Sequence, residues 1–156
     1  MKIFLSGPLF TAAEREFNRQ LETLLKKAGH DVWLPQDKDA KPRAAVPIFV
    51  KILKGLQAAD VIVANMDGPD PDSGTSWECG YSYASGIPVI AFRTDSRKQR
   101  NTKLGPYNLM MWTSATERLD GPFSNVKEVA ESVQPLLNKA TLKRKQALQR
   151  AKLHLQ

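Results

Sequence analysis

Val61-Ile62-Val63-Ala64 leads through a turn-rich loop into Asp72-Ser73-Gly74-Thr75-Ser76-Trp77-Glu78-Cys79-Gly80-Tyr81. The uninterrupted apolar run predicts a buried strand, and the second stretch is typical of the start of a helix. The loop between them is acidic, and the helix carries a glutamate near its start. Ligand sites in α/β proteins lie at the carboxyl ends of strands, so we expect carboxylate chemistry at this junction.

Apolar strands alternate with amphipathic helices on both sides of this junction. Strands are expected at 3–5, 32–34, 61–64 and 88–92 and within 109–113, and helices at 12–28, at 47–58, from the Thr75 cap to about Ser85, and at 124–137. The alternation favours an α/β fold, a flavodoxin-like open five-stranded parallel sheet with helices on both faces. In such a sheet the loops after the first, third and fourth strands converge on one ligand site.

The net charge of +7 is concentrated near the end of the chain. Residues 139–156 contain no acid and six bases, which are Lys139, Lys143, Arg144, Lys145, Arg150 and Lys152. We therefore divide the chain into a near-neutral domain, 1–138, and a basic helical tail, 139–156. A second basic group falls in a predicted loop and comprises Arg93, Arg97, Lys98, Arg100 and Lys103. We interpret both groups as solvated surface and do not expect nucleic acid as a partner, with phosphate or RNA contact as the alternative.

Length and composition predict one globular domain, with 156 residues of which 42% are apolar and 25% charged. The single cysteine, Cys79, and the widely separated His30 and His154 argue against a metal site, and no cofactor is expected. No window approaches the roughly 18 apolar residues of a membrane span. The apolar start, 1–7, is too short for a secretory signal, so a cytoplasmic protein is expected.

Glu78 has two interpretations. In the first it completes a capping box, with Thr75 as the helix N-cap and Glu78 three residues later. In the second it is a nucleophile. A carboxylate in the first turn meets the positive end of the helix dipole, which favours the ionised form, and an ionised carboxylate can attack a sugar carbon.

Asp72 also has two interpretations, as an ordinary loop or Asx-turn residue and as the partner of Glu78. Glycosyl transfer needs one carboxylate to attack and one to handle the proton of the leaving group. We interpret Asp67 and Asp70 as turn formers and Cys79 as a core residue. Gly74 permits a close approach of the backbone.

The loop Ser6-Gly7-Pro8-Leu9-Phe10 follows the first strand. It contains neither a dinucleotide-binding fingerprint nor a Walker motif. Phe10 could cover a nucleobase or sugar, or act as a hydrophobic staple on the first helix.

Three segments together resemble the nucleoside 2-deoxyribosyltransferase family. Ile3-Phe4-Leu5-Ser6-Gly7-Pro8-Leu9-Phe10 is similar to its first strand and loop, Asp72 to Tyr81 to its Asp-x-Gly-x-x-x-Glu-x-Gly segment, and Asn108-Leu109-Met110 to its Asn-Leu-Met segment. With the order of elements, the resemblance spans residues 2 to about 137.

The resemblance implies a retaining two-step transfer of 2-deoxyribose from a 2'-deoxynucleoside to a free nucleobase. Glu78 would form a covalent deoxyribosyl intermediate, and Asp72 would assist protonation of the leaving base. The substrate-binding residues it implies are Gly7, Pro8, Leu9, Phe10, Gly74, Asn108 and Met110. In the family the Asn-Leu-Met segment comes from a neighbouring subunit, which implies a homo-oligomer with a shared active site.

Two positions depart from the family pattern. Ile52 stands where the family often has Asp or Asn, and Phe4 or Ile3 stands where it often has a tyrosine. The second change removes a hydroxyl that could orient the nucleophile, for which Tyr81, Tyr83 or Tyr107 could substitute. The basic tail has no counterpart in the resemblance.

Two alternatives to transfer are kept. The first is an N-glycosidase that hydrolyses 2'-deoxynucleoside 5'-monophosphates. The loop 6–10 lacks the glycines and arginine of such hydrolases, but Arg15, Arg93 or the loop 97–103 could bind phosphate. The second is a non-catalytic nucleotide-binding module in which Glu78 is only a cap.

Overall fold

A computed structural model describes residues 1–37, 44–97 and 105–153. Five strands form one sheet in the order β2-β1-β3-β4-β5, and each neighbouring pair is parallel. The strands are β1 Lys2–Ser6, β2 Asp31–Trp33, β3 Val61–Asn65, β4 Val89–Arg93 and β5 Glu117–Asp120. This order confirms the predicted flavodoxin-like fold, and its switch point lies between β1 and β3.

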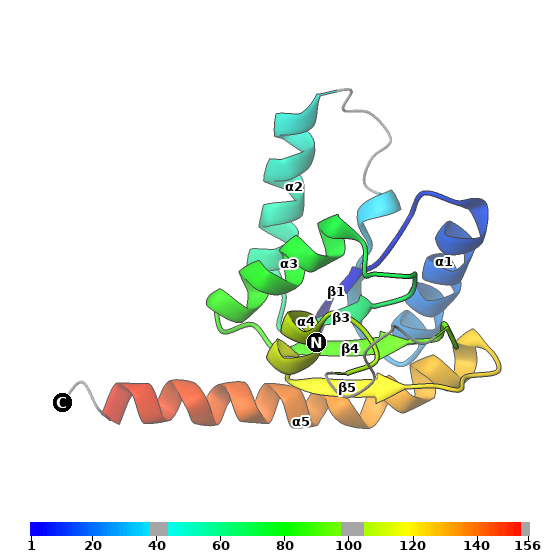
Figure 1. The fold of residues 1–156 in the computed structure, drawn as a ribbon. Coiled ribbons are helices and arrows are strands. Elements are labelled where there is room, and N and C mark those ends of the chain that lie inside the picture. Colours follow the sequence, from blue (N-terminus) through cyan, green and yellow to red (C-terminus); the bar gives the residue numbers. More distant parts are fainter. Residues whose placement is uncertain (38–43, 98–104, 154–156) are drawn as a thin grey trace.

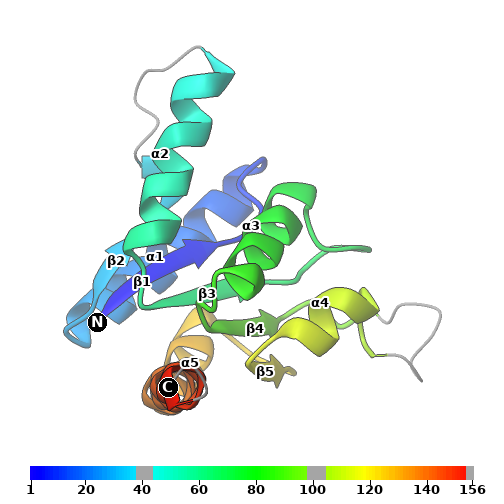
Figure 2. The ribbon, with the colours of Figure 1, turned by 90° about the vertical axis from the view of Figure 1, so that its left-hand side faces the viewer.

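Helices cover both faces of the sheet (Figures 1 and 2). On one face lie α1 Ala12–Lys27 and α5 Val126–Leu153; on the other lie α2 Ala45–Ala58, α3 Ser73–Ala84 and α4 Leu109–Ser114. A short 3-10 turn, η1 Pro35–Asp37, follows β2. Among the described elements, no helix has the length and apolar character needed to cross a membrane.

Alternation along the strands divides the core into two layers. Ile3 and Leu5 of β1 pack with α1 and α5, whereas Phe4 packs with α2, α3 and α4. Side chains of successive strand residues point to opposite faces, so Ser6 shares the face of Phe4. The end of β1 therefore presents Ser6 toward the helix that carries Glu78.

The prediction of a strand within 109–113 is wrong, because these residues form α4. The side chain of Asn108 caps this helix by accepting a hydrogen bond from the Met110 N–H at 3.0 Å. The fifth strand, β5, lies later, at Glu117-Arg118-Leu119-Asp120. It pairs with β4 at the edge of the sheet, and three of its four residues are charged, so it lacks the apolar run by which the other strands are recognised.

The last helix, α5, runs without interruption from the domain into the basic tail. Lys139 and Lys143, on either side of the buried Ala140, reach Glu117 of β5 at 2.9 and 2.6 Å. Beyond these contacts the helix extends past the sheet (Figure 1).

Candidate active site

Glu78 lies on α3 with its carboxylate against the end of β1. Its side chain accepts a hydrogen bond through Oε2 from Ser6 Oγ, and the two residues are 8% and 1% exposed. The predicted capping box is wrong: α3 begins at Ser73, so Glu78 lies in the second turn. The carboxylate is therefore bound to a neighbouring strand rather than to the helix start.

Asp72, not Thr75, is the N-cap of α3. Its Oδ2 accepts hydrogen bonds from the Thr75 N–H at 2.9 Å and from Thr75 Oγ1 at 3.3 Å. A Cβ at Gly74 would lie 3.0 Å from the same oxygen, which explains the glycine beside the cap. The cap fixes where Asp72 stands relative to Glu78.

Burial raises the pKa of Glu78 from its usual 4.5 to about 7. The Ser6 hydrogen bond acts in the opposite direction, and the nearby charge of Asp72 adds to the rise. The net effect is opposite to the one expected from the helix dipole, because Glu78 is buried and lies beyond the first turn of α3. Near neutral pH the carboxyl is thus divided between its protonated and ionised forms. Cys79 is a core residue, as predicted, and burial raises its pKa to about 12.

The loop after β1 is held in place by α1. Asn18 Nδ2 donates to the Pro8 carbonyl at 2.9 Å, and Arg15 Nη1 donates to the carbonyls of Leu9 and Phe10, both at 3.1 Å. A Cβ at Gly7 would lie 3.0 Å from Asn65 Cβ, so a larger residue would force the loop or the end of β3 to shift. The loop therefore runs from Ser6 past the end of β3, at the switch point between β1 and β3.

Phe10 is 71% exposed, so the predicted hydrophobic staple is wrong. The entry to α1 is fixed instead by a capping box, in which Thr11 Oγ1 accepts from the Glu14 N–H and Glu14 Oε2 accepts from the Thr11 N–H. The ring of Phe10 is therefore exposed to solvent just before the N-cap of α1.

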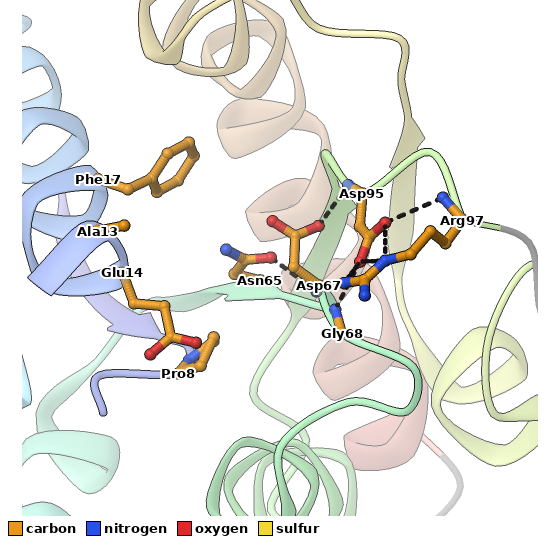
Figure 3. A pocket seen from close by; sticks show the side chains of 9 residues that line it. All are labelled: Pro8, Ala13, Glu14, Phe17, Asn65, Asp67, Gly68, Asp95 and Arg97. Carbon is orange, nitrogen blue, oxygen red and sulfur yellow. Dashed lines mark hydrogen bonds and ion pairs between the residues drawn. The ribbon is translucent and has the colours of Figure 1, made fainter. Parts of the chain in front are cut away.

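Asp67 joins the loops that follow β3 and β4, a role that the interpretation as a turn former missed. Its Oδ1 accepts from the N–H groups of Thr94 and Asp95 at 2.6 and 2.7 Å, and its Oδ2 accepts from Thr94 Oγ1 at 2.6 Å. With Asn65 and Pro8 it borders a cavity of about 310 Å³ between these loops and α1 (Figure 3). Glu78 does not line this cavity.

Arg93 is 4% exposed, so its assignment to a solvated loop is wrong. Its guanidinium donates to the carbonyls of Met66, Gly68 and Arg97. Arg97 is exposed and paired with Asp95, and this hydrogen-bonded pair holds the pKa of Asp95 well below its usual range. Of the same predicted basic group, Lys98, Arg100 and Lys103 lie outside the described residues.

Asn108 caps α4 and Met110 lies in its first turn; α4 packs next to α3, and both residues are exposed. In the described part of a single chain, neither shares a hydrogen bond with Glu78. Ile52 lies on α2, is partly buried and packs against the core layer beneath α2, α3 and α4. In the same described ranges, no group of three His, Cys, Asp or Glu side chains could hold a metal ion.

The tyrosines predicted to orient the nucleophile are placed elsewhere. The Tyr81 hydroxyl accepts from Gln57 Nε2 at 3.3 Å, Tyr83 is exposed, and the Tyr107 ring packs edge-on against Trp112. The hydroxyl on Glu78 comes from Ser6. The feature of the sequence that could have indicated this hydrogen bond is a serine at the end of a buried strand.

Comparisons with known proteins identify the family of this chain. The family model for nucleoside 2-deoxyribosyltransferases matches residues 3–110, while a search of curated proteins found no match. Among solved structures, a conserved protein from Enterococcus faecalis V583 is 26% identical with a TM-score of 0.69, covering 86% of this chain and 98% of its own.

Two further structures are transferases. The 2-deoxyribosyltransferase from Bacillus psychrosaccharolyticus is 26% identical, with a TM-score of 0.66 and coverage of 83% of this chain and 90% of its own. The 2-desoxiribosyltransferase from Leishmania mexicana is 26% identical, with a TM-score of 0.62 and coverage of 83% and 97%. The chain is therefore an enzyme that belongs to the nucleoside 2-deoxyribosyltransferase family.

Proposed function

We propose that this enzyme transfers 2-deoxyribose between nucleobases with retention, through a covalent intermediate on Glu78. The observation that carries the proposal is the buried Glu78 carboxylate, held by Ser6 at the switch point and flanked by Asp72. A nucleophile and a second carboxylate in one site are the groups that a retaining glycosyl transfer needs.

In the first step a carboxylate oxygen of Glu78 forms a bond to the anomeric carbon of a 2'-deoxynucleoside. The glycosidic C–N bond breaks, its electron pair goes to the base nitrogen, and the leaving base takes a proton through Asp72. A nitrogen of the second base then attacks the same carbon, the ester C–O bond breaks, and Glu78 recovers its charge. The second base gives up its N–H proton to Asp72, and two inversions at one carbon restore the original configuration.

The charge state of Glu78 suits this chemistry. Only the ionised carboxylate attacks, and with a pKa of about 7 a substantial fraction is ionised at neutral pH. The same desolvation that raises the pKa also leaves the anion poorly solvated and therefore reactive.

The described cations favour nucleosides over 5'-monophosphates. Arg15 and Arg93 donate to backbone carbonyls, and Arg97 is paired with Asp95. Arg15 and Arg93, both considered above as phosphate ligands, are thus committed to holding loops in place, and Arg97 is neutralised by Asp95 within its own loop. A phosphate would also approach the charges of Asp72 and Glu78.

An exposed apolar surface on α2, α3 and α4 supports a homo-oligomer. It includes Val46, Phe49, Trp77, Tyr83, Leu109 and Met110, and Phe49, Trp77 and Tyr81 form a continuous series of ring contacts. Such a surface marks a protein interface. We propose that a second subunit covers it and supplies Asn108 and Met110 to the site.

A base-exchange assay tests the proposal. Deoxyinosine with free adenine should yield deoxyadenosine and hypoxanthine in equal amounts. Hypoxanthine with free sugar would indicate hydrolysis, and a strong preference for deoxyinosine monophosphate would contradict the nucleoside assignment. Glu22→Gln is a matched control, because Glu22 is as buried as Glu78 but pairs with Lys26 on α1. It should retain activity.

A further inference from the structure

Ser6 ends β1 on the face of the sheet that α3 covers. Its hydroxyl is buried, and a buried hydroxyl without a hydrogen-bond partner destabilises the fold. Glu78 Oε2 provides that partner across the boundary between strand and helix. Since a serine hydroxyl donates best to a charged acceptor, the contact favours the ionised carboxylate over the protonated form.

A second serine contacts the same glutamate at a different atom. Ser82, one turn further along α3, donates through Oγ to the backbone carbonyl of Glu78 at 2.7 Å. Both serines are fully buried. Ser6 therefore contacts the Glu78 carboxylate, whereas Ser82 contacts only the Glu78 main chain. Ser82 can thus serve as a matched control for Ser6.

The groups that act on the Glu78 carboxyl oppose one another. Burial and the charge of Asp72 raise its pKa, and Ser6 lowers it. Cys79, the other titratable neighbour, has its pKa raised to about 12 and is neutral near pH 7. Among the described residues, Ser6 is thus the side chain that favours the charged nucleophile.

We propose that Ser6 is the positioning residue of the Glu78 nucleophile: its hydroxyl holds Oε2 and thereby presents Oε1 to the anomeric carbon. An oxygen that accepts a hydrogen bond is the weaker nucleophile, so the bond to carbon forms from Oε1. Ser6 keeps its proton throughout and does not itself touch the substrate. The activity readout of this inference rests on the proposed function.

The test compares Ser6→Ala, Ser6→Thr and Ser82→Ala, each checked for folding by its thermal transition. In the exchange assay Ser6→Ala should lower kcat about 10-fold or more, the range for losing a hydrogen bond to a charged group. The acidic limb of its pH–rate profile should move to higher pH. Ser6→Thr keeps the hydroxyl and should restore most of kcat, and Ser82→Ala should leave the limb in place.

A second readout does not need activity. In protein labelled with 13C at the glutamate carboxyls, the signal that Glu78→Gln removes belongs to Glu78. Its titration midpoint should rise in Ser6→Ala and stay unchanged in Ser82→Ala. Equal midpoints in Ser6→Ala and the unmodified protein would overturn the inference. If the unmodified enzyme transfers no sugar, the proposed function fails, and the carboxyl titration alone then decides whether Ser6 acts on Glu78.

Discussion

Glu78 and Glu117 are both 8% exposed, yet they are held in opposite ways. Glu78 lies at the carboxyl ends of the strands, with a serine hydroxyl as its partner and Asp72 nearby. Glu117 begins β5 at the amino ends, where Lys139 and Lys143 contact it. Burial tends to raise the pKa of each, but at Glu117 the hydrogen bonds and charges of Lys143 and Lys139 outweigh it and lower the pKa.

The difference shows that burial alone does not make a carboxylate reactive. With two cations beside it, Glu117 is charged at neutral pH and ties α5 to the edge of the sheet. With one neutral donor and one like charge, Glu78 is left near the midpoint of its titration at neutral pH. The first arrangement stabilises the fold, and the second suits a nucleophile.

The strongest test of the different roles of Glu78 and Glu117 is to replace each glutamate by glutamine in turn. Glu78→Gln should lower kcat about 10³-fold or more, because an amide cannot form the ester intermediate. Glu117→Gln should keep kcat within about two-fold, since its contacts lie at the opposite ends of the strands. Base exchange followed by chromatography measures both. Comparable losses in the two variants would contradict the assignment of roles.

The pH dependence of activity should follow Glu78 and not Glu117. Below the Glu78 pKa of about 7, kcat/KM should fall about 10-fold for each pH unit, as the attacking carboxylate is protonated. Replacing both Lys139 and Lys143 by Met should leave this limb unmoved. If the acidic limb of the pH–rate profile moved in this variant, the Glu78 and Glu117 regions would be electrostatically coupled.

Stability should respond to pH in opposite senses at the two residues. For Glu78 the folded pKa lies above the unfolded one, so the folded chain binds more protons between pH 4.5 and about 7 and loses stability as the pH rises through that window. Glu78→Gln should therefore be more stable than the unmodified protein at pH 8, by about 1–3 kcal/mol. Urea unfolding at pH 8 and at pH 4.5 measures this, and a gain of the same size at both values would rule out titration as its cause.

Glu117 should give the smallest effect, with the opposite sign. Its folded pKa is lowered, so its contribution is present above the unfolded pKa and is lost as the pH falls through the folded value. Glu117→Gln should be less stable at pH 8 by about 1 kcal/mol, a small value because both lysines are half exposed. The same urea series provides the measurement, and a stabilised variant would contradict the tie between β5 and α5.

Most of the fold could be predicted because its first four strands are apolar runs. For β3, for example, the sequence predicts residues 61–64, and the strand extends one residue further. β5 could not be recognised from an apolar run, because most of its residues are charged. It is an edge strand, and its Glu117 is paired with a lysine of α5. The run 109–113 was mistaken for it, since the cap by Asn108 depends on a local geometry that hydrophobicity does not reveal.

The site was predictable as a motif but not as a set of contacts. The spacing of Asp72 and Glu78 predicts that the two residues lie near each other. The cap by Asp72 is a local contact with Thr75, whereas the partner of Glu78 depends on tertiary structure. Ser6 and Glu78 are 72 positions apart in the chain. Arg93 was expected in solvent because a lone arginine after a strand gives no sign of the carbonyls that surround it. The catalytic roles of Asp72 and Glu78 remain predictions.

The most direct test of the central claim is mass spectrometry of the enzyme quenched in acid after reaction with deoxyinosine alone. The account predicts one deoxyribosyl group on the peptide that contains Glu78. The adduct should disappear when adenine is added before the quench and should be absent from Glu78→Gln. Base exchange without any adduct, or an adduct on another residue, would contradict Glu78 as the nucleophile.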